Sequence, residues 1–324
     1  RFLKWQKEED TFLINEENKS EAKIVIIDEA SMLDNNLFYN LLLGLKPNCK
    51  IVMIGDSNQL PSVGAGQVLK DIIESDCTPV TYLKKLYRQD KHSNINLLAH
   101  DIIEGKLDFS IFNESDDLTF IPCNKDNLKE KLEEFILTYK DLSIYDIQVL
   151  APIYKGDNGI DALNIYIQEL LNKKDAFKNE LLYNGVIYRE TDKVIELVNS
   201  IEDNVFNGDI GEIIRVTKNK KKEITCDFDG NIVVYDKKDL KNIKHAYAIT
   251  IHKSQGSEFD HVIMPITINY GAMLYNKLIY TGVSRAKKSL IIVGDPVQFS
   301  RAVQNDYGSQ RKTALKEKLL NAYK

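Results

Sequence analysis

The chain has few cysteines, and none of them forms a recognisable motif. The four cysteines lie far apart among 324 residues and include no CxxC pair. This spacing argues against a zinc site and a disulfide framework and is typical of reduced thiols in a cytoplasmic protein. No run of about 18 uncharged apolar residues occurs, so the sequence predicts no membrane span. The first residues also lack the apolar core of a signal peptide.

An excess of positive charge is also lacking. The formal net charge is -5, whereas small obligate DNA-binding proteins are usually basic. This deficit is only weak evidence against DNA binding, because large motor proteins can confine their positive charge to one groove. Residues 215–244 and 285–288 are locally basic, so the charge is unevenly distributed.

The phosphate-binding sequence GxxxxGK[ST] does not occur in these 324 residues. In P-loop NTPases the backbone of that loop surrounds the phosphates, and its lysine contacts the β- and γ-phosphates. A polypeptide of this sequence therefore lacks one part of a common ATPase site. The sequence also shows no cluster typical of a metal-dependent nuclease.

Short apolar runs alternate with helical patterns along most of the chain. Residues 24–27 (IVII) and 51–54 (IVMI) are typical of buried strands. Between them, Asp34 is suited to cap a helix whose apolar positions include Leu37 and Leu42. Strands that are apolar throughout predict a parallel sheet covered on both faces.

A second α/β unit is predicted further along the chain. Its expected strands are residues 147–150, 261–264 and 290–293, and its expected helices are residues 160–171, 272–284 and 309–322. The acidic stretch 108–130 is expected to connect the two units. Residues 205–244 instead contain short strands and turn signals, which predict a small antiparallel β-module. Asp229-Gly230 predicts a tight hairpin within it.

An acidic pair, Asp28-Glu29, directly follows the first predicted strand. Ligands of doubly wound sheets bind at the carboxyl ends of strands. One carboxylate there is able to hold Mg²⁺, and a second is able to orient and deprotonate water. Nucleotide hydrolysis needs this division of labour. An acidic pair is more often a solvated strand end, so the pair alone does not decide the function.

Gln59, Arg88 and Arg285 are further candidates for a nucleotide site. Gln59 follows the second predicted strand and is able to contact a terminal phosphate or position the attacking water. An arginine that reaches a γ-phosphate stabilises charge in the transition state. An ordinary polar turn explains Gln59 equally well, and a surface salt bridge is the commoner explanation for either arginine alone. Two arginines from separate units, together with Asp28-Glu29, suit a cleft that nucleotide closes.

Residues 250–258 (TIHKSQGSE) gather hydroxyl, imidazole, ammonium and amide groups in one turn. Such a turn is able to bind phosphates through its side chains and its backbone N–H groups. His252 by itself is more often a packed or capping residue than a catalyst. No Ser-His-Asp arrangement stands out nearby.

Taken in order, these segments resemble the motifs of superfamily 1 DNA helicases of the RecD/TraA type. The segments similar to motifs II to VI are VIIDEASMLD (25–34), GDSNQLPSVGAG (55–66), LYRQ (86–89), AYAITIHKSQGSEFD (246–260) and LIYTGVSRAKKSL (278–290). QVLAPIYKG (148–156) and VFNGDIGEI (205–213) are also similar to that branch. Each segment alone is weak, but their order and spacing cover nearly the whole chain and make the combined match specific.

The resemblance implies an α/β fold with two RecA-like parallel-sheet domains, the first of them incomplete, and a small SH3-like β-barrel insert in the second. The first domain would comprise residues 1–110, the second residues 111–204 and 245–324, and the insert residues 205–244. ATP would bind between the two RecA-like domains. The start of the chain looks like the segment that precedes motif II, so we expect a fragment without motif I.

The resemblance also implies roles for individual residues. Asp28 would hold Mg²⁺, Glu29 would activate water, and Gln59 and Arg88 would sense the γ-phosphate. Arg285 would act as an arginine finger, and Gly256 and Glu258 would lie near the nucleotide. The DNA-binding residues would be Tyr154, Lys155, Thr250, His252, Lys253 and Gln255.

The implied function is an ATP-dependent helicase that moves 5′ to 3′ on single-stranded DNA in the cytoplasm, with nuclease or recombination subunits as candidate partners. We expect the fragment alone not to hydrolyse ATP. One alternative is a non-enzymatic DNA-binding or assembly subunit of a helicase–nuclease complex, although the joint presence of the catalytic charges argues against it. Another is a different P-loop NTPase, which the segments around residues 252–260 and 281–288 disfavour. The lysines at 218–222 are interpreted either as a DNA contact or as a solvated turn.

Overall fold

The computed structural model describes residues 2–6, 9–83, 93–113, 115–217, 222–306 and 311–323. The chain forms two compact units. Unit 1 comprises residues 1–86 and 306–324, and unit 2 comprises residues 87–305. The observed division therefore falls earlier than the predicted one at residue 110, and the last helix belongs to unit 1 instead of the second domain.

Unit 1 is built on two parallel strands, β3 (Ile24–Ile27) and β4 (Lys50–Met53). Helix α1 (Asn35–Leu43) connects them, and the Asp34 carboxylate caps it by accepting a hydrogen bond from the backbone N–H of Leu37 at 2.7 Å. The cap is therefore where the sequence predicts it.

Among the described residues of unit 1, one face of the β3–β4 sheet is covered and the other is exposed. Val25 lies on the covered face and packs in a core with Leu41 and Leu45. On the other face the side chains of Ile26 and Val52 are 66% and 45% exposed. The prediction of a sheet covered on both faces is therefore wrong for unit 1.

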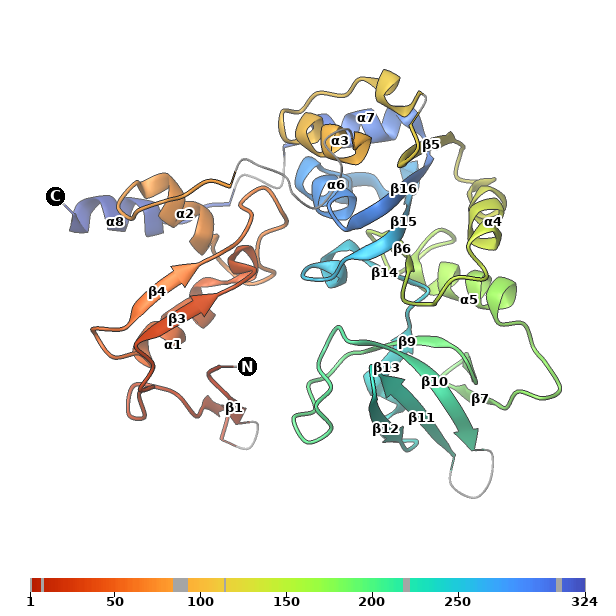
Figure 1. Ribbon diagram of the computed structural model, residues 1–324, viewed down its shortest axis with the longest axis horizontal. Coiled ribbons are helices and arrows are strands. Elements are labelled where there is room, and N and C mark those ends of the chain that lie inside the picture. The colour runs from red at the N-terminus through yellow and green to blue at the C-terminus, as the bar shows by residue number, and fades with distance from the viewer. Residues whose placement is uncertain are drawn as a thin grey trace. The chain divides into compact units, whose positions relative to one another are not determined.

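The remaining elements of unit 1 are short. They are β1 (Trp5–Gln6), β2 (Thr11–Phe12), the 3₁₀ turn η1 (Ala30–Met32), α2 (Val68–Ser75) and α8 (Leu315–Ala322). Helices α2 and α8 lie side by side although more than 200 residues separate them in the sequence (Figure 1). Leu37 and Leu42, which the helical pattern placed on an apolar face, are exposed.

Unit 2 contains a five-stranded parallel sheet. Its strand order is β14 (Ala248–Thr250), β6 (Ile147–Ala151), β15 (Phe259–Ile266), β16 (Ala286–Gly294) and β5 (Leu118–Pro122). The three predicted strands of this unit are confirmed. The stretch 108–130 contains strand β5 and lies wholly in unit 2, so the prediction that it holds the connection between the two units is wrong.

Helices cover both faces of this sheet. On one side lie α3 (Asn94–Ile103), α6 (Asn276–Val283) and α7 (Pro296–Gln304), and on the other lie α4 (Leu128–Thr138) and α5 (Ile160–Leu171) (Figure 1). Helix α5 has the predicted bounds. The 3₁₀ turns of unit 2 are η2 (Phe109–Phe112), η3 (Leu240–Asn242), η4 (Ile251–Ser254) and η5 (Ile268–Met273).

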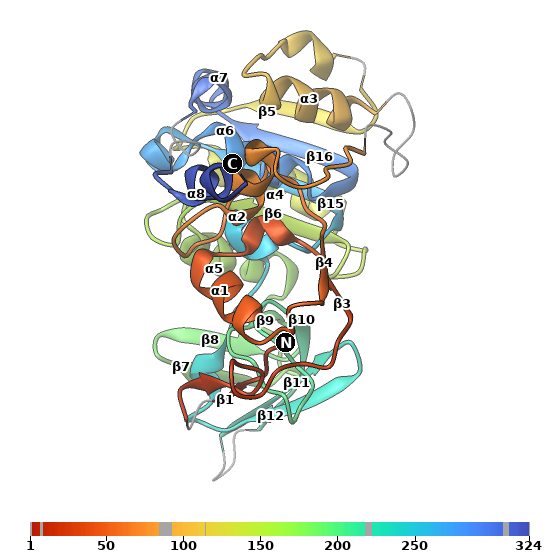
Figure 2. The ribbon, with the colours of Figure 1, turned by 90° about the vertical axis from the view of Figure 1, so that its left-hand side faces the viewer.

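An antiparallel β-module interrupts unit 2. Its sheet has the order β12 (Asn231–Tyr235), β11 (Glu223–Phe228), β10 (Ile210–Thr217), β9 (Lys193–Glu196) and β13 (Ile243–His245). The predicted boundary at residue 205 lies between β9 and β10 of this one sheet. The hairpin β7 (Glu180–Tyr183)–β8 (Val186–Arg189) precedes it, and all these strands gather at one end of unit 2 (Figures 1 and 2).

The predicted tight turn of this module is confirmed. Phe228 pairs with Asn231, so only Asp229 and Gly230 form the loop between β11 and β12. Their φ angles are 53° and 88°, as a type I′ turn requires at both central positions.

None of the helices in the described ranges combines the length and apolar character needed to cross a bilayer.

Candidate nucleotide and nucleic-acid sites

The acidic pair of unit 1 lies just beyond the carboxyl end of β3. Asp28 is exposed and Glu29 is half-buried. Glu29 adopts the left-handed conformation (φ 49°, ψ 41°), which costs about 1–2 kcal/mol for a residue with a side chain. The next residue, Ala30, donates its N–H to the carbonyl of Ile54 at 2.9 Å. This bond ties the turn that carries both carboxylates to the residue that follows β4.

Gln59 belongs to the loop that follows β4 in the same unit. The loop packs closely on the acidic turn, because a Cβ atom added at Gly55 would lie 3.0 Å from the backbone nitrogen of Ala30. Gln59 is buried. Asp28, Glu29 and Gln59 thus come from two loops at the same edge of the sheet.

Two buried polar atoms of this region have no hydrogen-bond partner within the described part of the chain. They are Oε1 of Gln59 and Oγ of Ser31. A buried polar atom without a partner costs about 1–3 kcal/mol, so such atoms in native proteins call for an explanation. The Ser31 hydroxyl is able to donate to a phosphate, and Gln59 Oε1 is able to accept from a water molecule. Together with the exposed carboxylate of Asp28 at the strand end, they fit a phosphate group with its hydrated magnesium ion, which proteins usually bind through one or two carboxylates and the phosphates.

Arg285 is the central charged residue of the corresponding region in unit 2. Its side chain is only 4% exposed. The guanidinium donates to the carbonyl of Ser257 at 3.1 Å and, through Nε, to the carbonyl of Thr281 at 3.2 Å. These bonds hold the end of α6 against the loop of residues 255–258, so Arg285, Gly256 and Glu258 lie together as a local cluster. Gly256 has φ +77°, a conformation that favours glycine.

The predicted nucleotide residues therefore fall into two groups. Asp28, Glu29 and Gln59 are in unit 1, and Arg285 is in unit 2. Arg88 lies outside the described residues. Convergence of the two groups on one nucleotide stays a prediction.

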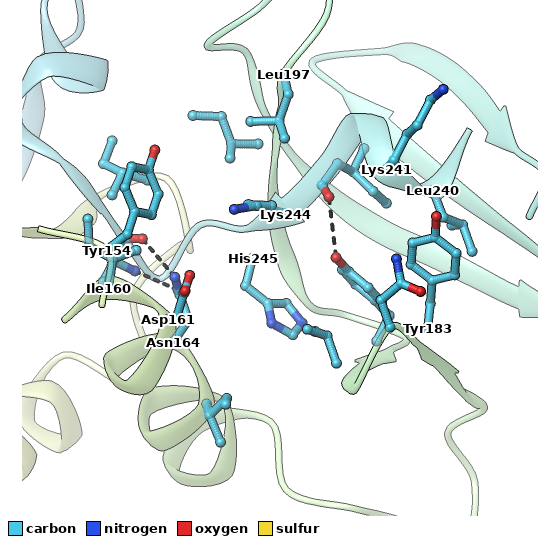
Figure 3. A pocket seen from close by; sticks show the side chains of 18 of the residues that line it. Tyr154, Ile160, Asp161, Asn164, Tyr183, Leu197, Leu240, Lys241, Lys244 and His245 are labelled. Carbon is cyan, nitrogen blue, oxygen red and sulfur yellow. Dashed lines mark hydrogen bonds between the residues drawn. The ribbon is translucent and has the colours of Figure 1, made fainter. Parts of the chain in front are cut away.

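A cavity of about 410 Å³ lies within unit 2, where the β-module joins the parallel-sheet core. Its walls come from α5, the β7–β8 hairpin and β13 (Figure 3). Three of the predicted DNA-binding residues line it, namely Tyr154, Lys155 and Lys253. The other three lie outside the lining, and they are Thr250, His252 and Gln255.

Residues 250–255 form the turn next to the cavity. The Thr250 hydroxyl caps η4 by accepting a hydrogen bond from the N–H of Lys253 at 3.1 Å. Burial lowers the pKa of His252, so its imidazole is mainly neutral at pH 7. Thr250 therefore shapes the turn that presents Lys253, while His252 adds little positive charge.

Sequence reasoning missed several lining residues, including Lys241, Lys244 and Tyr183. The Lys244 ammonium lies 5.0 Å from the centroid of the Tyr154 ring, within the range of a cation–π interaction, and Figure 3 shows it pointing toward that ring. The lysine-rich stretch 237–244 was visible in the sequence. Nothing in it indicated which lysines face the core.

The cavity carries a net positive charge. Its charged lining side chains are Lys155, Lys241, Lys244, Lys253 and one carboxylate, Asp161. Asp161 is already engaged, because Lys155 Nζ donates to it at 2.7 Å. Lys253 donates to the side-chain oxygen of Asn207 at 2.8 Å. Burial, and to a lesser extent Lys244, lowers the pKa of Lys253, so this ammonium gains from an anion placed nearby.

Three family models match the chain in sequence order. They describe an AAA domain (residues 1–125), the SH3 domain of ATP-dependent RecD-like DNA helicases (163–228) and the C-terminal domain of UvrD-like helicases (245–293). The ATP-dependent RecD2 DNA helicase of Deinococcus radiodurans is 29% identical over 296 residues, or 91% of this chain. The chain is therefore similar to RecD-like DNA helicases over nearly its whole length.

Other relatives show the same similarity. The RecBCD enzyme subunit RecD of Buchnera aphidicola is 26% identical over 92% of this chain. The chain spans 58% of that protein and 39% of the Deinococcus protein. Among solved structures, the Pif1 helicases of Bacteroides, in complex with ADP-AlF3 and single-stranded DNA, and of Candida albicans share the fold. Their TM-scores are 0.52 and 0.53, and their sequences are 18% and 16% identical to this chain. Each match covers 94% of this chain and 76% of the other.

Proposed function

We propose that this RecD-like chain is the nucleotide-responsive and DNA-gripping part of an ATP-driven helicase that moves 5′ to 3′ along single-stranded DNA. The observation that carries the proposal is the cavity of unit 2. Tyrosine rings and lysines converge there beside the turn of residues 250–255, and one face of the cavity is the SH3-like module. The similarity to RecD-like helicases and the two groups of nucleotide residues support the same function.

The residues at the strand ends of unit 1 would serve hydrolysis. Asp28 would hold Mg²⁺. ATP would supply the phosphoanhydride bond, and the ion would neutralise the charge of its phosphates. Glu29 would orient a water molecule and accept its proton. Gln59 would accept a hydrogen bond from that water through Oε1, which lacks a partner in the described residues, or donate to the terminal phosphate through its amide Nε2.

The residues of unit 2 would complete the nucleotide site. Arg285 would stabilise negative charge on the γ-phosphate, and Gly256 and Glu258 would lie beside the nucleotide. Arg88 would be a second γ-phosphate contact. In the present structure the Arg285 guanidinium binds backbone carbonyls, so reaching a phosphate would require it to exchange these partners.

The cavity would hold single-stranded DNA by two complementary interactions. A base would stack on Tyr154, because every base has a flat π-face and aromatic stacking tolerates any sequence. Lys155, Lys244 and Lys253 would neutralise backbone phosphates, which makes the affinity sensitive to salt. Thr250, His252 and Gln255 would contact the DNA backbone from the neighbouring turn.

The wider context follows from the same similarity. We assign unit 1 to the first RecA-like domain and the parallel-sheet part of unit 2 to the second, instead of a boundary at residue 110. Because some relatives are RecBCD subunits, nuclease or recombination subunits are candidate partners. Four unpaired cysteines favour the reducing cytoplasm.

A strand-displacement assay tests the proposed activity. A polypeptide that contains these 324 residues together with a GxxxxGK[ST] loop should unwind a duplex with a 5′ single-stranded tail when ATP is present. It should leave a duplex with a 3′ tail intact. Equal unwinding of both substrates would contradict the polarity, and failure on both would contradict the helicase function.

One observation favours a second candidate function for the 324-residue chain by itself. Its sequence contains no GxxxxGK[ST] loop, so alone it would act as a DNA-binding or assembly module without ATP turnover. Phosphate release measured with and without single-stranded DNA separates the two candidates. We expect no release above background, and DNA-stimulated release by this chain would refute that expectation.

A further inference from the structure

The C-terminal segment of the chain contacts the loop that carries Gln59. Nη1 of Arg311 donates hydrogen bonds to the carbonyl oxygens of Gly64 and Gly66, each at 2.8 Å. These carbonyls lie near the end of the loop of residues 55–66, five and seven positions after Gln59. All of these residues belong to unit 1. Nη1 carries two hydrogens, so it can serve both carbonyls, and its positive charge makes each bond stronger than one between neutral groups.

A second set of contacts anchors the same segment on α2. The Thr313 hydroxyl donates to the carboxylate of Asp71, which is 1% exposed and also accepts from the amide of Gln67 at 3.0 Å. Further along, Lys316 pairs with Glu74 at 3.2 Å, but both side chains are more than 40% exposed. The buried Thr313–Asp71 contact therefore contributes more to docking than the surface pair.

The opposite side of the loop is held by the segment that follows the acidic pair. The N–H of Asn35 donates to the carbonyl of Ala65 at 2.9 Å. A Cβ atom added at Gly64 would lie 2.3 Å from Oδ2 of Asp34, so only glycine allows this approach. The loop is thus fixed between the start of α1 and Arg311. Gly66 contacts both Asn35 and Arg311. Its φ of +101° is a conformation available to glycine.

We infer that Arg311 is a positioning residue for nucleotide sensing. It fixes the loop of residues 55–66 through two carbonyls and thereby fixes the buried side chain of Gln59. This role rests on the proposed function of Gln59. The segment that contains Arg311 follows unit 2 in the sequence. Through this contact it becomes part of the nucleotide region of unit 1. A lysine is a poor substitute, because it is a compact point charge without the planar fork of donors that arginine carries.

Hydrogen–deuterium exchange of the 324-residue chain tests the positioning. In R311A the amides of residues 57–66 should exchange about thirtyfold faster, since two hydrogen bonds of roughly 1 kcal/mol each are lost. R311K should give an intermediate increase. The matched control K316A, which removes only the exposed ion pair, should leave these amides unchanged. Unchanged exchange at residues 57–66 in R311A would overturn the inference.

The side-chain amide of Gln59 provides a second readout. In ¹⁵N-glutamine-labelled protein its NMR signal, identified by its absence in Q59N, should shift or broaden in R311A and partly recover in R311K. Faster exchange throughout β3, β4 and α1, with no change specific to Gln59, would mean a merely structural role and would overturn the inference. If R311A fails to fold, R311K supplies both readouts.

Neither readout requires ATP or DNA. A chain that shows the expected exchange and NMR changes but belongs to no active helicase would disprove the proposed function and leave the Arg311 contact standing. An active helicase in which R311K and R311A change neither the loop nor Gln59 would disprove the inference alone.

Discussion

The parallel sheets of the two units are built from similar sequences but are buried very differently. In unit 2 the apolar residues in the middle of the central strands are fully buried, and Val262, Ile263 and Ile292 are 0% exposed. In unit 1 the equally apolar strand β3 alternates, with Val25 buried and Ile26 66% exposed. Five strands with helices on both sides bury their apolar side chains, whereas the two strands of unit 1 leave one face exposed among the described residues. An apolar strand is therefore not necessarily buried on both faces. Its burial depends on whether the rest of the domain provides helices that cover each face.

The buried carboxylate of unit 2 also accepts more hydrogen bonds than the buried carboxylate of unit 1. In unit 2, Asp192 is 0% exposed and accepts five hydrogen bonds. They come from Gln168 and Asn172 of the α5 region, the backbone of Arg189, His245 and Tyr247. In unit 1, Asp71 accepts from Gln67 and Thr313. Asp192 therefore joins the β-module to the core, whereas Asp71 joins two helices.

The largest expected effect comes from these carboxylates. D192A should destabilise unit 2 by about 3–5 kcal/mol, because it breaks a buried network and leaves several donors without an acceptor. D71A should cost unit 1 about 1–3 kcal/mol, since fewer donors are affected. Urea unfolding followed by far-UV circular dichroism reports both losses, and fluorescence of the single tryptophan, Trp5, reports unit 1. A larger loss for D71A than for D192A would break the comparison.

The next effect tests the two sheets directly. I292A in β16 should cost about 2–5 kcal/mol, because it removes a large side chain from a closed core. The matched change I26A in β3 should stay within about 0.5 kcal/mol, as is usual for exposed positions. The same urea measurement compares them. Equal losses would show that the exposed face of β3 is covered in solution.

A smaller, pH-dependent effect concerns Lys193 at the start of β9. Its side chain is 1% exposed, Nζ donates to the carbonyl of Ile147 at 2.9 Å, and burial lowers its pKa to about 7. Above that pH the folded chain holds the amine neutral while the unfolded chain, with its ordinary pKa, still binds the proton. The unfolded state then binds more protons, so stability rises with pH by roughly 1 kcal/mol per unit between about pH 7 and 10.

K193M isolates this contribution. The difference in unfolding free energy between wild type and K193M should favour K193M more at pH 7.5 than at pH 9.5. K316M, which alters an exposed lysine of unit 1, should show no such trend. A pH-independent difference for K193M would mean that Lys193 keeps its charge in the folded chain.

Local signals in the sequence predicted much of this architecture. The cap at Asp34, the bounds of α5 and the hairpin at Asp229-Gly230 depend on neighbouring residues, and the structure has all three. Partners far apart in the sequence were not predictable in this way. No periodic pattern indicates that α8 packs on α2 or that β9 joins the sheet of β10 and β13.

The residues of the candidate sites also differ in how well the sequence predicted them. Residues at strand ends, such as Asp28 and Gln59, were predictable because parallel strands present their carboxyl ends at one edge. Lys244 and Tyr183 were not, since their position in the cavity depends on how the β-module docks on α5. The predicted residues Arg88, Lys218, Lys220 and Lys221 lie outside the described part of the chain, so their roles remain predictions.

Binding of a fluorescein-labelled single-stranded oligonucleotide, followed by anisotropy across a salt series, tests the central proposal most directly. The chain should bind single strands in preference to duplex. K244A should lower the salt slope by about 0.7, and Y154A should weaken binding by about 1–3 kcal/mol. K46A, on the surface of unit 1, should bind like wild type. No binding, or the same affinity and salt slope for all four proteins, would contradict the account.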